Sequence, residues 1–154
     1  MALELIKQQT GSSVTALAVE NCFTADYDVY ILQVAKGDFA SNAYIWARFI
    51  DSGGSVITDS EYAYGSLDMY SNTGFAELKS TSVTAIPAFG LSTAGSADFG
   101  GITMYIQSSS KSTYLIGNKI MGAHKSQEQL SGIQLNRSAG DSFDMTINMY
   151  GVKP

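Results

Sequence analysis

Short segments in which hydrophobic and polar residues alternate run through most of the chain. The clearest lies in residues 142–151, where every second side chain is apolar. Phe143, Met145, Ile147 and Met149 fall on one side of an extended backbone, and Asp144, Thr146 and Asn148 fall on the other. A period of two is typical of a β-strand that packs on a core with one face and meets water with the other.

Other segments are rich in Val, Ile, Tyr, Phe and Thr, the residues that suit a pleated, half-buried surface. They predict strands over residues 27–35, 42–51, 101–107 and 113–121, with weaker patterns over 2–8, 14–20, 55–58 and 129–136. In 42–51 both alternating sets are bulky, which predicts that both faces of this strand are covered, one by the interior and the other by a neighbour such as another subunit.

Gly- and Ser-rich turns separate these segments, and Pro87 and Pro154 are the only prolines. No linker-like tract divides residues 1–154, so we expect a single domain. Residues 61–78 fit neither the helical nor the strand period and are open to two interpretations, a strand pair or one short helix. Eight or more short strands without a clear helical period predict an all-β fold, an antiparallel jelly-roll-like β-sandwich.

Composition narrows the classes of function. The chain has 154 residues, 15% of them charged, and a net charge of −5, which is the wrong sign for neutralising nucleic-acid phosphates. One cysteine permits no intramolecular disulfide and no cysteine-based zinc knuckle. No apolar run approaches the length of a membrane span, and residues 1–7 do not follow the pattern of a secretion signal. We therefore expect neither nucleic acid nor membrane as a partner.

Candidate catalytic chemistry is sparse. Cys22 and His124 are the only thiol and imidazole, and no flanking signature places them together, so we interpret them as a buried inert thiol and a surface-loop histidine. Paired carboxylates at Asp26 and Asp28, and at Asp59 and Glu61, could bind calcium, but nothing resembles a full ligand loop and solvated strand ends are the favoured interpretation. We predict no cofactor, no metal site and no enzymatic activity.

Aromatic residues are the one enriched set with a possible binding role, because Tyr and Trp lose little entropy on contact. They are open to two interpretations, core packing or an interface. The N-terminal residues 1–9 are likewise either an attachment arm that pairs with a neighbouring strand or the first strand of the chain's own sandwich. The resulting candidate interface residues are Leu3, Leu5, Ile6, Tyr44, Trp46, Tyr62, Tyr64 and Tyr70.

Three patches resemble a family of tailed-bacteriophage virion structural proteins. Residues 131–152 are similar to that family's closing strand, glycine turn and final strand with an aromatic-Gly-aliphatic end, here Tyr150-Gly151-Val152. Residues 21–32 are similar to its Phe-Thr-x-x-Tyr-Asp-x-Tyr segment, and residues 101–106 with Tyr114 to its central strand pair. The segment Leu130-Ser131-Gly132 departs from the family, which often has a Trp or another bulky residue there.

The resemblance implies a capsid decoration, or cement, protein that binds the major capsid protein lattice and stabilises the head. Its partners would be the major capsid protein and copies of itself, with a homotrimer expected. It would be assembled in the host cytoplasm and displayed on the capsid surface of the virion. The alternative is a tail fibre, spike or adaptor module that binds host-surface glycan through exposed Tyr and Trp.

Overall fold

A computed structural model describes residues 2–39, 43–70, 74–91, 97–99, 101–107, 112–117, 120–138 and 140–153. Within these ranges the chain forms thirteen strands and no helix, so no described segment forms a helix that could span a bilayer. All pairings between the described strands are antiparallel. The predicted all-β, single-domain sandwich of the jelly-roll type is confirmed.

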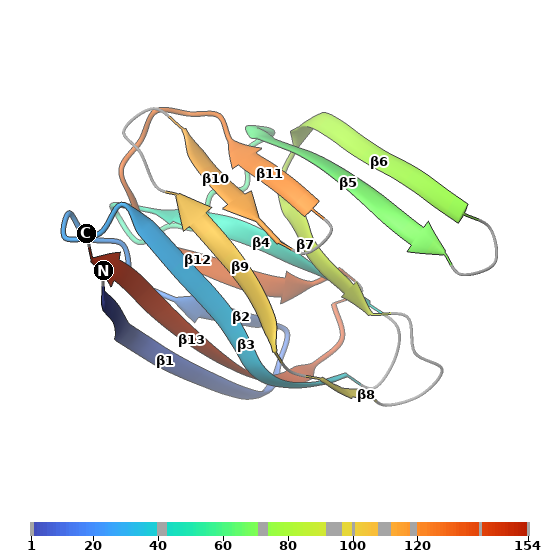
Figure 1. Cartoon of the computed structure of the whole chain (residues 1–154), viewed down its shortest axis with the longest axis horizontal. Coiled ribbons are helices and arrows are strands. Elements are labelled where there is room, and N and C mark those ends of the chain that lie inside the picture. The colour runs from blue at the N-terminus through green and yellow to red at the C-terminus, as the bar shows by residue number, and fades with distance from the viewer. Residues whose placement is uncertain are drawn as a thin grey trace.

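The described strands make two sheets, which pack face to face (Figure 1). The larger sheet has nine strands, and β8 (Ala97–Phe99) pairs with β3 off its main path. The main path runs β1 (Ala2–Val14), β13 (Phe143–Lys153), β3 (Val29–Phe39), β9 (Ile102–Gln107), β10 (Thr113–Ile116), β11 (Ile120–His124), β5 (Tyr62–Tyr70) and β6 (Gly74–Val83). The smaller sheet runs β2 (Ala16–Val19), β12 (Leu130–Arg137), β4 (Ala43–Asp51) and β7 (Ile86–Leu91).

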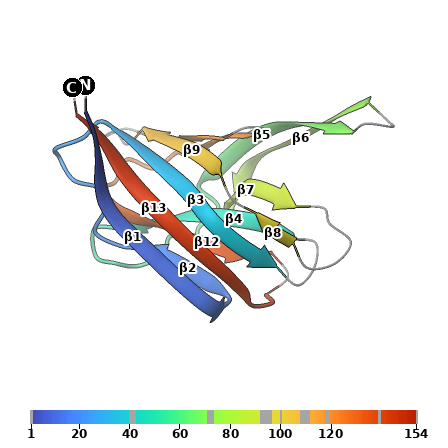
Figure 2. The ribbon, with the colours of Figure 1, turned by 60° about the horizontal axis from the view of Figure 1, so that its bottom comes forward.

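The chain closes two sides of the sandwich by passing from one sheet to the other. It leaves β1 for β2 across Thr15, two residues after Ser13, whose φ is 52°. It leaves β6 for β7 across Thr84 and Ala85. Beyond this second corner the β5–β6 pair extends away from the smaller sheet, as Figure 2 shows. The two chain ends lie side by side, because Ala2 pairs with Lys153.

The core fills the space between the sheets. Its largest fully buried side chains include Tyr30, Phe39 and Phe49. The alternation predicted for residues 142–151 is confirmed, because the side chains of the apolar set in β13 are buried and Asp144 is exposed. In β4, Ile45 and Phe49 are buried. In the opposite set Ile50 is also buried, whereas Trp46 is half-buried and Tyr44 is exposed.

Three sequence interpretations change with the structure. Residues 113–121 form two strands, β10 and β11, instead of the single predicted strand, and Ile116 pairs with Met121 across the hairpin. Residues 55–58 form no strand and contribute one isolated bridge, between Ile50 and Val56. Residues 61–78 adopt the strand pair of the two alternatives, in β5 and β6.

The N-terminal segment is the first strand of the chain's own larger sheet. Residues Ala2 to Val14 pair with β13, with a register shift between Leu5 and Lys7. β1 lies at the sheet edge, and among the described strands of this sheet it pairs with β13 alone. One long side of its backbone is therefore open to pairing with another chain.

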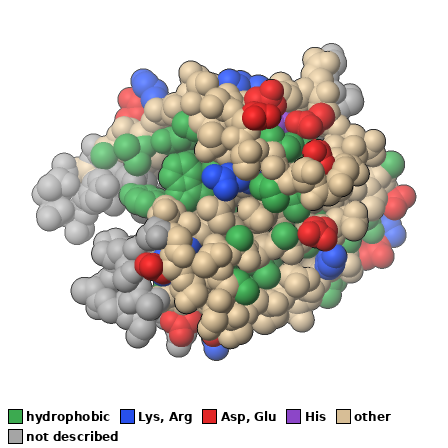
Figure 3. Space-filling view, turned by 180° about the vertical axis from the view of Figure 1, so that it is seen from behind, with side chains coloured by type: hydrophobic (Ala, Val, Ile, Leu, Met, Phe, Trp, Pro, Cys, Tyr) green, Lys and Arg blue, Asp and Glu red, His purple; other side chains and the backbone are tan. Residues whose placement is uncertain are grey.

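The rear of the molecule, on the side of the smaller sheet, is mostly uncharged (Figure 3). Charged side chains are scattered over it, and the blue Lys and Arg groups form no continuous patch on this face. This distribution agrees with the low charged fraction of 15% in the sequence.

Candidate functional site

The outer face of the larger sheet carries a row of apolar side chains that crosses six strands. Residues directly opposite one another on neighbouring strands point to the same face of a sheet. The strand register therefore aligns one residue from each of β1, β13, β3, β9, β10 and β11, in the order Leu5, Tyr150, Ile31, Tyr105, Ile116 and Met121.

A second row runs beside the first, two residues along each strand. It consists of Leu3, Val152, Val29, Gln107, Tyr114 and Ala123, in the same strand order. We call the ten large apolar side chains of the two rows the apolar band: Leu3, Leu5, Val29, Ile31, Tyr105, Tyr114, Ile116, Met121, Tyr150 and Val152.

Much of the apolar band is exposed to solvent. Tyr105, Ile116 and Met121 are 52%, 45% and 57% exposed, and Leu3 and Leu5 are 58% and 52% exposed. Isolated exposed apolar residues are normal, but a contiguous apolar patch on a soluble domain typically marks an interaction site.

The same face becomes polar beyond the band. Gln8 donates to the amide oxygen of Asn148 at 2.8 Å, and Asn148 donates to that of Gln33 at 3.4 Å. The hydroxyls of Thr10 and Thr146 lie 3.1 Å apart in the next row. The sheet face thus has an apolar half and a hydrogen-bonding half, and the boundary between them would fix the orientation of a docked partner.

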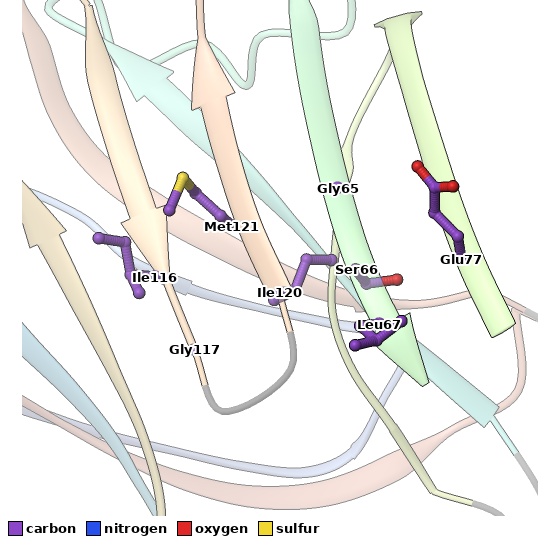
Figure 4. A pocket seen from close by; sticks show the side chains of 8 residues that line it. All are labelled: Gly65, Ser66, Leu67, Glu77, Ile116, Gly117, Ile120 and Met121. Atoms are coloured by element: carbon purple, nitrogen blue, oxygen red, sulfur yellow. The ribbon is translucent and has the colours of Figure 1, made fainter. Parts of the chain in front are cut away.

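A shallow groove with a volume of about 450 Å³ extends the apolar band toward β5 and β6. Ile116 and Met121 lie on one side of it, and Leu67 and Glu77 lie on the other (Figure 4). Gly65 pairs with Met121 and has no side chain, so the surface is hollowed between these two sides. A side chain of a partner could enter the groove and meet mostly apolar atoms.

The predicted interface residues of the N-terminal segment lie in or beside the band. Leu3 and Leu5 belong to it, at its β1 end. Ile6 sits at the register shift of β1, where it is half-buried and packs against the core.

The predicted aromatic interface residues divide between surface and core. Tyr44 is exposed on the smaller sheet, and Trp46 beside it is half-buried. The indole N–H of Trp46 is buried and has no hydrogen-bond acceptor in the ranges that the structure describes. Tyr64 is half-buried against the core, and the side chain of Tyr70 lies outside the described residues.

The prediction for Tyr62 is wrong, because this side chain is fully buried. Its hydroxyl donates to the carbonyl oxygen of Ile57 at 3.1 Å and accepts from the amide of Phe49 at 3.0 Å. Burial raises the pKa of Tyr62 to about 12. Tyr62 therefore joins β5 to the smaller sheet and has no part in an outer interface.

The interface residues predicted from the sequence do not include the exposed residues Ile116 and Met121. Tyr105 and Tyr114 belong to the enriched aromatic set but not to the predicted interface. The signal was a Gly-Asn pair at Gly117-Asn118, which is a turn signal between two apolar runs and predicts a hairpin. This signal predicts the hairpin but not its register, because a two-residue Gly-Asn turn would pair Ile116 with residue 119, whereas the structure pairs Ile116 with Met121.

Cys22 is a buried core thiol, as predicted. Its Sγ donates to the carbonyl oxygen of Val19 at 3.2 Å. Burial raises the pKa of Cys22 to about 12, so the sulfur is a neutral thiol near pH 7. Since the thiolate is the nucleophilic form, this residue is poorly suited to covalent catalysis.

His124 is buried at the end of β11, so the prediction of a surface-loop histidine is wrong. Its Nε2 faces two carboxylates, those of Glu61 and Glu128. These three residues are the one grouping in the described part of the chain with the donor set for a metal ion. The carboxylate pair Asp26 and Asp28 is exposed and contributes to no such group there.

An ion pair joins the edge strand β1 to β13 beside the apolar band. The Glu4 carboxylate forms an ion pair with the Lys153 ammonium at 2.5 Å. The hydrogen bond from Lys153 lowers the pKa of Glu4 and raises that of Lys153. This pair links the first and last strands at the point where the chain ends meet.

Comparisons with known proteins assign no family to this chain. No family model and no curated protein matches the chain. Similar solved structures include a galectin of Caenorhabditis elegans, with a TM-score of 0.41, 6% identity and coverage of 97% of this chain and 96% of the galectin. A lichenase from a mouse hindgut metagenome has a TM-score of 0.41 and 8% identity, over 96% of this chain and 79% of the lichenase.

A fructofuranosidase variant from Schwanniomyces occidentalis has a TM-score of 0.42 and 9% identity. It matches 99% of this chain, which spans 34% of the fructofuranosidase. At this level of similarity these structures carry no argument about activity, ligand or partner.

Proposed function

We propose that this chain is a structural protein of a tailed-bacteriophage virion, a capsid decoration protein that binds the major capsid protein lattice and stabilises the head. The observation that supports this proposal best is the exposed apolar band on the outer face of the larger sheet. The three sequence patches that resemble phage virion proteins give the class of partner. The role is adhesion, without chemical transformation of a substrate.

The apolar band suits adhesion because its shape and composition are those of a docking surface. Its side chains come from six neighbouring strands, so the surface is held by the backbone hydrogen bonds of the sheet and needs little ordering on binding. Tyr105 and Tyr114 supply large rigid faces, which interfaces favour. The groove beside Met121 has room for a protruding side chain of a partner.

Contacts between copies of the chain would use other surfaces. The exposed Tyr44 and half-buried Trp46 lie on the smaller sheet, on the opposite side of the sandwich from the band. A neighbouring subunit over this face would cover the exposed side chain of Tyr44 and the half-buried side chain of Trp46. Each additional contact in a symmetric shell stabilises the assembly by mass action.

Copy number in purified particles tests the proposal. Quantitative mass spectrometry of virions would compare this chain with the major capsid protein in the same sample. Hundreds of copies per particle are expected for a decoration protein. A few to a few tens of copies would contradict it in favour of the tail fibre or adaptor module, and absence from purified particles would contradict both.

A further inference from the structure

Glu61, His124 and Glu128 converge at one end of the β5–β11 strand pair. Glu61 directly precedes β5, His124 is the last residue of β11, and Glu128 follows in the connection to β12. The amide of Lys125 donates to the carbonyl oxygen of Glu61 at 2.9 Å, which fixes the two backbone segments side by side. The candidate donor atoms of the three side chains all lie within 4.8 Å of one another.

The imidazole of His124 is buried and makes no hydrogen bond within the described part of the chain. The ring is fully buried between Phe49 and Tyr62, with ring centroids 6.0 Å and 4.9 Å away. Neither ring nitrogen has a hydrogen-bond partner among the described residues. Buried polar atoms without a partner are rare in proteins and call for an explanation.

Nε2 of this ring points at two carboxylates that reach the surface. It lies 3.2 Å from Oε1 of Glu128 and 3.5 Å from Oε2 of Glu61, and the two glutamate side chains are 34% and 41% exposed. In Figure 3, red acidic side chains lie on either side of the purple histidine. An ion from solvent can therefore reach the carboxylates, while the imidazole approaches from the protein interior.

A histidinium ion pair explains this arrangement poorly. Nε2 carries at most one proton, which lies along one direction, yet both carboxylates approach this same nitrogen. Neither contact has the alignment of a hydrogen bond. By contrast, donors about 2.1 Å from a tetrahedral zinc ion lie about 3.4 Å from one another. The separations of 3.2 Å and 3.5 Å between Nε2 and the two carboxylate oxygens match that spacing, and all three donor atoms lie within 4.8 Å of one another.

We propose that Glu61, His124 and Glu128 bind a divalent transition metal ion of the zinc type. His124 Nε2, Glu61 Oε2 and Glu128 Oε1 are the ligands, and the two carboxylates neutralise the charge of the ion. The buried nitrogen ligand selects zinc over calcium and magnesium, which prefer oxygen ligands alone. The hydroxyl of Ser126 donates to Glu61 Oε2 and orients this carboxylate from outside the ligand set.

Metal binding would tie the start of β5 to the connection between β11 and β12. Three protein ligands leave a fourth tetrahedral position, which water or a side chain of a neighbouring molecule can fill. The site thus adds a cross-link to a sandwich whose single cysteine cannot form an intramolecular disulfide.

Calorimetric titration of the full-length, tag-free chain with zinc chloride tests this proposal, with calcium chloride as the competitor. The chain must carry no histidine tag, because the tag would itself bind zinc and would hide binding at His124, the only histidine of the sequence. We expect one zinc site per chain that excess calcium does not displace. At free zinc about 100 times Kd, the melting temperature should rise by about 5–10 °C.

Isosteric variants assign the ligands. Glu61→Gln and Glu128→Gln should each weaken zinc binding at least tenfold, whereas Glu77→Gln, which removes an exposed carboxylate paired with Lys79, should leave it unchanged. Nitrogen NMR of the native chain gives a readout independent of any variant, because one imidazole contributes every histidine signal. Zinc should shift the Nε2 resonance of His124.

Two results would overturn the assignment. One is equal zinc affinity in the native chain and in the combined Glu61→Gln, Glu128→Gln variant. The other is an Nε2 resonance that shows a histidinium and does not respond to zinc.

Discussion

Replacing Ile116 and Met121 together by serine should detach the chain from its capsid partner without unfolding it. These two residues face each other across the β10–β11 hairpin and form the end of the apolar band that borders the groove. Both side chains point outward, so the double substitution removes apolar surface from the docking face and leaves the core intact.

The size of the effect follows from the surface that these side chains still expose. Full burial of an isoleucine or methionine side chain contributes about 1.5–3 kcal/mol. Since Ile116 is 45% and Met121 is 57% exposed, covering them in a complex would contribute about 1 kcal/mol or slightly more each. Losing both should weaken binding by about 2–3 kcal/mol, or about 30- to 150-fold in Kd.

The assay is binding of the fluorescently labelled chain to particles that lack it, followed by sedimentation. Gln33→Ser is the matched control, because Gln33 lies on the same sheet face but in its polar half. The free energy of unfolding of the double variant, measured in urea, should fall by no more than about 1 kcal/mol. Unchanged binding by the folded double variant, or an equal loss in Gln33→Ser, would refute the assignment of the apolar band as the docking surface.

Three further outcomes follow from the packing and ionisation of the core. Gly132→Ala should lower the free energy of unfolding, measured in urea, by about 1–3 kcal/mol, because the new Cβ would lie 2.3 Å from the carbonyl oxygen of Val19. Gly65→Ala is the control and should leave the free energy of unfolding unchanged, because no described atom lies within 4 Å of its new Cβ. Cys22 should react with a thiol probe only as fast as the chain unfolds, and rapid labelling of the folded chain at pH 7 would contradict its assignment as an inert core thiol. Burial raises the pKa of Tyr62 to about 12, so the folded chain keeps the hydroxyl proton to a higher pH than the unfolded chain does. The contribution of this group to the free energy of unfolding is therefore complete below pH 10 and should be lost as the pH rises through 10–12. In the Tyr62→Phe variant the melting temperature should fall less steeply between pH 10 and pH 12 than in the native chain. Thermal unfolding at a series of pH values measures this, and identical pH profiles for the two chains would contradict the prediction.

The fold could be predicted from the sequence wherever alternation was clean. The strand around Ile147 was predicted within two residues of its observed ends, because one face is buried and the other is not. The prediction failed at residues 113–121, where two short apolar runs were joined into one strand across Gly117. Local composition cannot separate one long strand from a hairpin unless the turn residues are recognised.

The candidate sites depend on register, which a single sequence does not contain. Tyr105 and Met121 are separated along the chain, and only the pairing of β9, β10 and β11 brings them onto one surface. Tyr62 was misplaced because an aromatic residue in a strand faces either the core or solvent, and the register shift at the start of the β5–β6 pair obscured the alternation. His124 and Glu128 are close in sequence, but Glu61 joins them only through the pairing of β5 with β11.

Electron cryomicroscopy of the intact virion tests the proposed adhesive role most directly. We predict density for this sandwich at hundreds of symmetry-related positions on the head, with Tyr105, Ile116 and Met121 turned toward the major capsid protein. A head surface without this density, or with that sheet face exposed to solvent at every position, would contradict the proposal.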